Sequence, residues 1–110
     1  MDNENSLMEF FSAENKREWK RYKTFLHPSV EWILFSDSKR QFTYGIGDYM
    51  DKMRSAYGKN EDSFICEKMI TSCNGQRIMA ILVNNHGHRS IDIFDFENGL
   101  IRNEYEFLMD

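Results

Sequence analysis

The second half of the chain, residues 63–110, most strongly limits the possible folds, because it alternates β-type segments with chain reversals. The segments "SFICEKMITSC", "QRIMAILVN", "SIDIFDF" and "LIRNEYEFLM" are rich in the β-branched and aromatic residues that favour strands. Asn74-Gly75 and Asn98-Gly99 are dipeptides typical of two-residue hairpin turns, in which both central residues need positive φ. "NHGH" supplies the reversal between them. The pattern predicts an antiparallel meander of four strands.

The first quarter of the chain predicts helices. "NSLMEFFSAE" places Leu7, Phe10 and Phe11 at helical spacing after Ser6, which is a candidate N-cap. "SAEN" is a predicted break, and "NKREWKRYKTFL" repeats the helical pattern with basic residues on its other face. Pro28 then ends the helix, because the residue before a proline is disfavoured in the α region.

The middle of the chain predicts two short strands and a third helix. "SVEWILF" and "QFTYG" are of β character and flank the turn "SDSKR". "GDYMDKMRSAYG" carries an apolar stripe of helical period that ends at Gly58, a predicted C-cap. The order of helices, two strands, a helix and four strands predicts an α+β fold. A chain of 110 residues is typical of one domain, so residues 1–110 form a single predicted unit.

Composition excludes several classes of function. The net charge of −4 gives no attraction for a phosphate backbone, so no nucleic-acid partner is expected. No apolar run is long enough to cross a bilayer, and "MDNENSLMEFF" lacks the basic-then-apolar layout of a signal peptide. Cys66 and Cys73 lie in one predicted strand with side chains on opposite faces, so a disulfide between them is not expected. These features predict a cytoplasmic protein without a membrane partner.

The run from Ile78 to Val83 is apolar on both faces of its predicted strand. An antiparallel sheet with one wet face alternates apolar and polar residues instead. Helices can cover one face, and a second copy of the same sheet is the economical cover for the other, because most soluble oligomers are symmetric. We therefore expect a homodimer through the outer face of the sheet.

The order and spacing of these segments resemble the nuclear transport factor 2-like superfamily, and within it the SnoaL-like proteins. The resemblance covers nearly the whole chain and is carried by "FLHPSVEW", "GIGDYMDKM" and "IDIFDFENGLIRNEYEF". It implies a cone-shaped, curved antiparallel sheet wrapped around the N-terminal helices and the third helix, as in cystatin-like folds, with a deep pocket. The superfamily contains isomerases, cyclases, dehydratases, hydrolases and non-catalytic modules, so the fold leaves the chemistry open.

The strand "SIDIFDF" is similar to the ketosteroid isomerase strand whose aspartate donates a hydrogen bond into the oxyanion hole. Asp92 falls on that aspartate. The position of the isomerase's catalytic base is occupied by Trp32, which cannot take a proton, while Glu31 points to the other face. The first helix carries no tyrosine for the oxyanion hole. Steroid isomerisation by that mechanism is therefore rejected.

Three acidic residues are the candidates for chemistry. Asp92 is either a solvated strand residue paired with Arg77 or Arg89, or a pocket carboxyl whose pKa burial would raise. The SnoaL-like resemblance puts Glu104 on the cavity side, whereas periodicity groups it with Glu106 on a polar face opposite Tyr105 and Phe107. We name Asp92 and Glu104 as candidate catalytic residues, acid and base respectively. For Glu106 a solvated edge is the favoured interpretation.

The remaining candidates concern the pocket walls and metals. The cone fold implied by the resemblance needs a lined cavity, for which Trp32, Tyr44, Tyr49, Met53 and Phe94 are the candidate ligand-binding residues. The "HGH" turn offers too few converging ligands for a metal site, so no metal and no cofactor are expected.

The expected function is therefore a SnoaL-like protein that binds a small apolar molecule. Its chemistry, where it has any, would be a cofactor-free isomerase, dehydratase, cyclase or hydrolase reaction by acid–base catalysis. The alternative is a non-catalytic dimerisation or ligand-sensing module, which the incomplete catalytic set and the doubly apolar run Ile78–Val83 favour.

Overall fold

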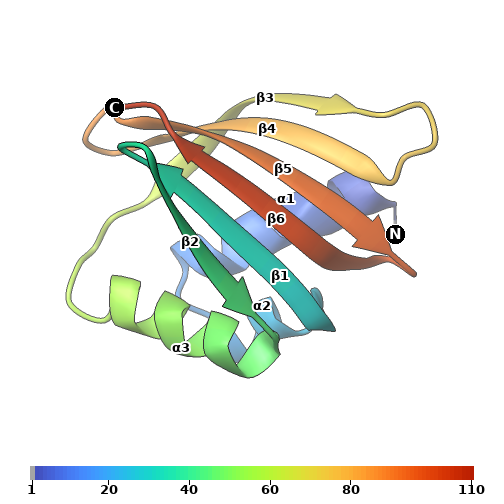
Figure 1. Cartoon of the computed structure of the whole chain (residues 1–110), viewed down its shortest axis with the longest axis horizontal. Helices are drawn as coiled ribbons and strands as arrows, with labels where there is room; N and C mark the ends of the chain where they lie inside the picture. Colours follow the sequence, from blue (N-terminus) through green and yellow to red (C-terminus); the bar gives the residue numbers. More distant parts are fainter. Residues whose placement is uncertain (1) are drawn as a thin grey trace.

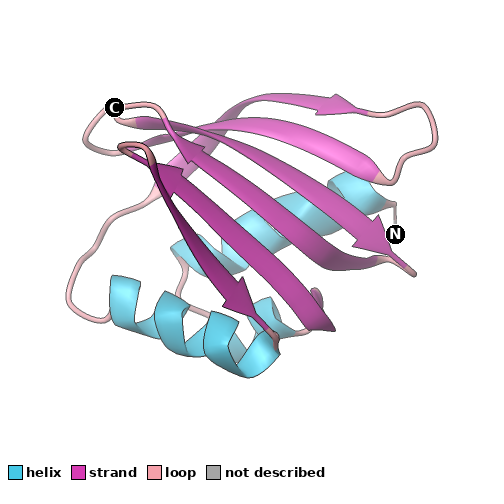
Figure 2. Cartoon of the chain, in the orientation of Figure 1, coloured by secondary structure: helices cyan, strands magenta, loops and turns pink. Residues whose placement is uncertain are grey.

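The computed structural model of the chain describes residues 2–110, and it is an α+β fold of three helices and one six-stranded sheet. The helices are α1 (Asn3–Asn15), α2 (Trp19–Lys23) and α3 (Ile46–Tyr57). The strands are β1 (Leu26–Ser36), β2 (Lys39–Tyr44), β3 (Phe64–Thr71), β4 (Arg77–Asn84), β5 (Arg89–Glu97) and β6 (Leu100–Leu108). All helices lie on one side of the curved sheet (Figures 1 and 2).

The strand order is β2-β1-β6-β5-β4-β3, so the last strand of the chain lies beside the first. The β1–β6 pair is parallel and all other pairs are antiparallel, which confirms the meander predicted for residues 63–110. Register shifts interrupt three of the pairs, β1–β6, β3–β4 and β5–β6. Such bulges bend strands and increase their twist, and here they accompany a sheet curved around α1 (Figure 1).

We call the face of the sheet toward the helices the inner face. Phe94 and Phe96 of β5 and Ile78 of β4 lie on it and are almost completely buried. They pack against α1, where the ring centroids of Phe10 and Phe11 lie 6.2 and 5.7 Å from that of Phe94. The core therefore fills the part of the inner face that α1 covers.

The helix boundaries differ from the predicted ones in two places. The N-cap of α1 is Asp2, whose carboxylate accepts a hydrogen bond from the Asn5 backbone nitrogen at 2.8 Å, and not Ser6. The helix also continues through "SAEN" and breaks only at Arg17, which has a positive φ of 58°. The second helix is shorter than expected, because Leu26 already begins β1. It thus ends before Pro28 can act on it.

The hairpin turns follow the predicted chemistry at one Asn-Gly dipeptide and not at the other. Asn98 and Gly99 both have positive φ, 52° and 78°, and join β5 to β6 as predicted. The prediction of a two-residue turn at Asn74-Gly75 is wrong, because only Gly75 has a positive φ. The Asn74 side chain instead accepts a hydrogen bond from the Gln76 backbone nitrogen at 2.9 Å, which stabilises a longer loop.

No helix among residues 2–110 is long and apolar enough to span a membrane. Neither Cys66 nor Cys73 is in a disulfide.

Candidate functional site

A cavity of about 500 Å³ lies between the inner face of the sheet and helices α1 and α3. Sites for small molecules commonly measure roughly 300–1,000 Å³, so the cavity is of suitable size. Exposed residues of the loop after α3 and of the β4–β5 turn, Asn60 and His88 among them, form its rim. The walls are largely aromatic and aliphatic: Phe10, Phe11, Trp32, Leu34, Met53, Phe64, Leu82 and Phe94.

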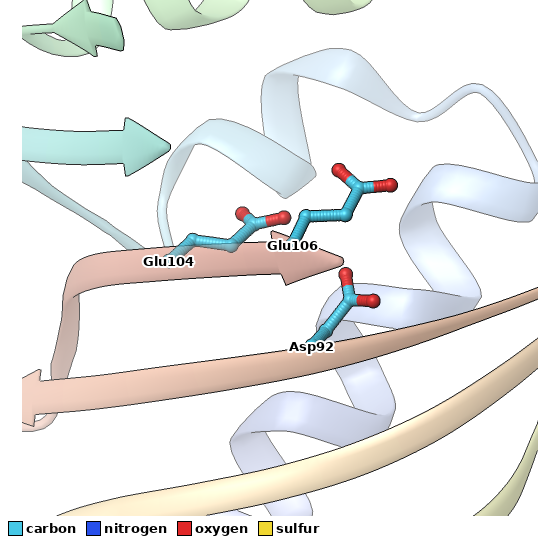
Figure 3. A group of neighbouring side chains, drawn as sticks. All are labelled: Asp92, Glu104 and Glu106. Carbon is cyan, nitrogen blue, oxygen red and sulfur yellow. The ribbon is translucent and has the colours of Figure 1, made fainter. Parts of the chain in front are cut away.

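Three carboxyl groups meet at the sheet side of this cavity. Asp92 of β5 lies opposite Glu106 of β6 in register, and Glu104 is the next residue of β6 on the same face. One oxygen of each lies within 4.8 Å of the others. Figure 3 shows the three side chains converging from the two neighbouring strands. We call Asp92, Glu104 and Glu106 the carboxyl cluster.

Each member of the carboxyl cluster receives one hydrogen bond from a neutral donor. The Ser90 hydroxyl donates to Asp92 at 2.7 Å, and the Trp32 indole N–H donates to Glu106 at 3.1 Å. The Tyr49 hydroxyl donates to Glu104. Among residues 2–110 no lysine or arginine forms a hydrogen bond or ion pair with the cluster, so no cationic side chain compensates the charge that its ionisation would create.

Burial controls the protonation of the cluster. Only 3% of Asp92 and 5% of Glu104 is exposed, and loss of hydration raises the pKa of both carboxyls well above their usual range. Repulsion from the neighbouring carboxylates, Glu106 for both of them, raises the pKa further. The pKa of Glu106 is also raised by burial, while the hydrogen bond from Trp32 lowers it. The cluster therefore holds protons at a pH where a solvated carboxyl is ionised.

A fourth carboxyl, Glu14 of α1, lines the same cavity and was missed by the sequence analysis. The Tyr57 hydroxyl donates to it at 2.5 Å. Burial raises the pKa of Glu14 to about 7, against the opposing effect of the hydrogen bonds from Tyr57 and Tyr22. A signal was present in the sequence, because Glu14 follows Leu7 by seven positions and so falls on the apolar stripe of its helix.

Four of the five predicted wall residues lie at or next to the cavity. Trp32, Met53 and Phe94 line it directly. Tyr49 is completely buried behind the wall, where its hydroxyl contacts both Glu104 and the Tyr22 hydroxyl. These positions follow from the alternation of faces in β1 and β5 and from the apolar stripe of α3.

The prediction for Tyr44 is wrong. Tyr44 is opposite Glu31 in register and shares its face of the sheet, away from the helices, so 58% of the residue is exposed. Its neighbour Thr43 occupies the inner face opposite Trp32. A slip of one residue in assigning the face of a short edge strand moves every side chain to the other side.

The expectation of a solvated edge for Glu106 is also wrong, because Glu106 is partly buried and lines the cavity. Glu106 follows Glu104 by two positions in the same strand, and this spacing already indicated that the two side chains share a face. The arginines considered as partners of Asp92 pair elsewhere: Arg77 binds Asp95 at 2.6 Å and Arg89 binds Glu67 at 2.8 Å. Asp92 is therefore a cavity carboxyl and not a surface ion pair.

The curved sheet with helices on its inner face is the nuclear transport factor 2-like, or cystatin-like, fold. No protein-family model and no curated protein matches the sequence. Solved structures match it over nearly the whole chain, at identities that establish the fold alone.

Three of these structures illustrate the likeness. An NTF2-like protein of unknown function from Cytophaga hutchinsonii is 18% identical, with a TM-score of 0.80, over 99% of this chain and 91% of that one. Bal32a, from a soil-derived mobile gene cassette, is 17% identical with a TM-score of 0.86 over 98% and 89%. The epoxide hydrolase/cyclase-like enzyme SalBIII of salinomycin pyran ring formation is 13% identical with a TM-score of 0.81 over 97% and 90%.

Proposed function

We propose that this protein binds a small, largely apolar molecule in the cavity and that the carboxyl cluster equips it for cofactor-free acid–base chemistry. The observation that carries the proposal is the meeting of three carboxyls, two of them almost completely buried, at one wall of a cavity whose other walls are largely aromatic and aliphatic. Apolar walls supply binding free energy, and a few placed polar groups orient the ligand. Isomerisation, dehydration, cyclisation and hydrolysis are the reactions that such groups can catalyse.

The roles within the cluster follow from the surroundings of each carboxyl. Asp92 is the proposed acid, since burial and the Glu106 charge keep it protonated. Glu104 is the base predicted from the sequence. Glu106 is the better acceptor, because it is the least buried member of the cluster and the hydrogen bond from the Trp32 indole lowers its pKa. One protonated and one ionised carboxyl side by side can divide the two roles.

Tryptophan fluorescence tests whether the cavity binds a ligand. Trp32 lines the cavity, whereas Trp19 packs on Tyr22 and Tyr57 outside it. In the Trp19→Phe variant, Trp32 is the single reporter, and we expect 4-nitrobenzyl alcohol, a quenching aromatic probe, to reduce its emission saturably at one molecule per chain. A linear, unsaturable quench equal to that of free tryptophan would contradict the proposal.

We further propose a homodimer through the outer face of the sheet, the face away from the helices. Met79 and Ile81 of β4 and Ile93 of β5 lie there, and Ile65 and Ile70 of β3, 65% and 50% exposed, extend it. An apolar surface that crosses several strands is typical of an interaction site. This face supports the alternative function, a dimerisation module, equally well.

Light scattering coupled to gel filtration measures the subunit count. We expect two chains for the native protein and one for Ile93→Lys, because Ile93 lies between Met79 and Tyr105 in register, at the centre of the face. Met8→Lys is the matched control, since Met8 is an exposed apolar residue of helix α1. A native protein that remains monomeric at about 100 µM would refute the dimer.

A further inference from the structure

Five carboxyl groups line the cavity, and no basic side chain among residues 2–110 is hydrogen-bonded to the carboxyl cluster. Asp92, Glu104 and Glu106 form the cluster, Glu14 faces the same space from α1, and Asp62 lies in the loop after α3, paired with His86 at 2.9 Å. The arginines around the cavity, Arg89 and Arg17, bind other groups. The Arg89 guanidinium, at the rim, binds Glu67 through Nε and a terminal nitrogen at 2.9 and 2.8 Å. Arg17 donates to the backbone oxygens of Glu14 and Asp62, at 3.1 and 2.7 Å, and not to the cluster.

Oxygens of the cluster are also left free to accept from a ligand. Asp92 is 3% exposed and accepts only from Ser90, through Oδ1, and Glu104 is 5% exposed and accepts only from Tyr49, through Oε1. No fully enclosed side-chain oxygen among residues 2–110 lacks a partner. The second oxygens of Asp92 and Glu104, which have no donor in the described chain, are therefore open to the cavity. Figure 3 shows the Asp92 carboxyl directed toward those of Glu104 and Glu106.

We propose that the physiological ligand is a small apolar or aromatic amine whose ammonium group is held by Asp92, Glu104 and Glu106 while its body packs on the aromatic walls. An ammonium has three N–H donors and can meet three carboxyl oxygens that lie within 4.8 Å of one another. Trp32 and Phe94, which line the same cavity, give the apolar body of the ligand aromatic surface to pack on. The inference depends on the proposed function, since it names the ligand class of the same cavity.

A bare divalent cation explains the site less well. Three carboxylates within 4.8 Å of one another could bind one ion. However, Mg²⁺ and Ca²⁺ complete their shells with six or more oxygen ligands, and beyond the three carboxyls and the Ser90 hydroxyl the neighbouring wall residues Trp32 and Phe94 offer none. The volume of about 500 Å³ also far exceeds the space that one ion needs. An amine with an apolar body uses both the carboxyls and the aromatic walls.

Binding of a cation should release protons from the cluster. In the free protein, burial and mutual repulsion keep Asp92 and Glu104 protonated. An ammonium beside them favours the ionised form, so the carboxyls deprotonate on binding. The ionisable groups that face the cluster from other elements are Glu14 of α1, Tyr22 of α2, Tyr49 and Tyr57 of α3, and Cys66 of β3. Proton release therefore distinguishes an amine in this site from one bound elsewhere on an acidic protein.

The test compares two probes of nearly equal shape, 4-nitrobenzylamine and 4-nitrobenzyl alcohol, by isothermal titration calorimetry near pH 7. We expect the amine to bind at least about tenfold more tightly, the effect of one charge-assisted hydrogen bond. Its apparent enthalpy should differ between phosphate and Tris buffers because released protons bind to the buffer, whereas that of the alcohol should not. Asp92→Asn and Glu106→Gln should each reduce the amine affinity about tenfold and reduce the alcohol affinity by a smaller factor.

Asp51→Asn is the matched control, because Asp51 is an exposed carboxyl of α3 and its replacement changes the net charge equally. It should leave both affinities unchanged. Alcohol and amine binding with equal affinity would overturn the amine inference and leave the proposed function standing, whereas failure of both probes to bind would count against both. Displacement of the alcohol by millimolar Mg²⁺ or Ca²⁺, with no preference for the amine, would instead assign the cluster to a metal ion and overturn the inference.

Discussion

At the scale of single residues, the buried carboxyls lower the folding stability of this protein at neutral pH. They are also the groups that can donate and accept protons in the cavity. Glu14 is 9% exposed and its pKa is raised from 4.5 to about 7. A folded-state pKa above the unfolded one means that the native protein binds the proton more tightly. The associated stability is fully present below about pH 4.5 and is lost as the pH rises through about 7. A group that weakens the fold at neutral pH is typical of functional sites.

Glu14→Gln should therefore make the free energy of unfolding less dependent on pH. A shift from 4.5 to about 7 corresponds to roughly 3 kcal/mol lost between pH 4.5 and 8. The other carboxyls whose pKa is raised act in the same direction. We therefore expect the variant to remove only part of the dependence of the unfolding free energy on pH. Urea denaturation at pH 5, 6, 7 and 8 measures it. Asp51→Asn is the control, and an unchanged slope in Glu14→Gln would show that Glu14 is hydrated in solution.

Tyr49→Phe should destabilise the protein, because the hydroxyl of Tyr49 joins two buried groups. It donates to Glu104, and it lies 3.1 Å from the Tyr22 hydroxyl. Loss of a partner for a buried polar group costs roughly 1–3 kcal/mol. The hydrogen bond also lowers the pKa of Glu104, so its removal should raise that pKa further. Thermal unfolding and carboxyl infrared titration check the two effects, and an unchanged melting temperature would argue against a shared network.

At the scale of elements, a turn and a register shift bring the cluster together. β5 and β6 are joined by Asn98-Gly99, and a one-residue shift in register between Asp95 and Phe96 then places Asp92 opposite Glu106. A residue with a side chain at Gly99 would be strained at φ +78°, although no atom lies within 4 Å of an added Cβ. The backbone conformation, and not the available space, therefore makes this glycine necessary.

Gly99→Ala and Gly47→Ala should shift stability in opposite directions. Gly99→Ala should cost roughly 1–2 kcal/mol, the penalty of a left-handed conformation for an L residue. Gly47 lies within α3, has no atom within 4 Å of an added Cβ and has no positive φ. Alanine there should stabilise the protein by roughly 0.4–1 kcal/mol. Chemical denaturation of both variants gives the comparison, and a loss of stability in Gly47→Ala would contradict the expected space around that helix.

At the scale of the whole molecule, the helices cover only part of the inner face, and the cavity is the part that they leave open. α1 packs on β5 through Phe10 and Phe11, while α3 lies nearest β1 and β2. The carboxyl cluster lies between these two contacts, on β5 and β6. A solid core would hold more apolar contacts, so a cavity of about 500 Å³ lowers stability and allows ligand access.

Leu34→Trp should weaken ligand binding without lowering the stability of the protein. Leu34 lines the cavity on the inner face, opposite Glu106 in register, and a larger side chain there would fill part of the volume. We expect the affinity for 4-nitrobenzyl alcohol to fall by at least about tenfold while the melting temperature is unchanged or higher. Calorimetric titration and thermal unfolding provide the two measurements. Retained affinity would place the bound probe elsewhere on the molecule.

The sequence alone determined the elements in this protein and suggested several of their faces. The α+β order, the meander and the third helix follow from local patterns, because the period of the apolar residues and the turn dipeptides mark each element. The cavity positions of Asp92, Trp32, Met53 and Phe94 were suggested by the resemblance to the SnoaL-like proteins.

Only the tertiary structure decided which of those faces meet. The carboxyls of Glu14, Asp92 and Glu106 come from a helix and two strands, and their shared surroundings depend on how α1 lies across the sheet. Tyr44 lies on the opposite face because the β1–β2 register sets it there. A local pattern shows that a side chain points inward, but the dielectric and the charges that it finds there are set by residues distant in the chain.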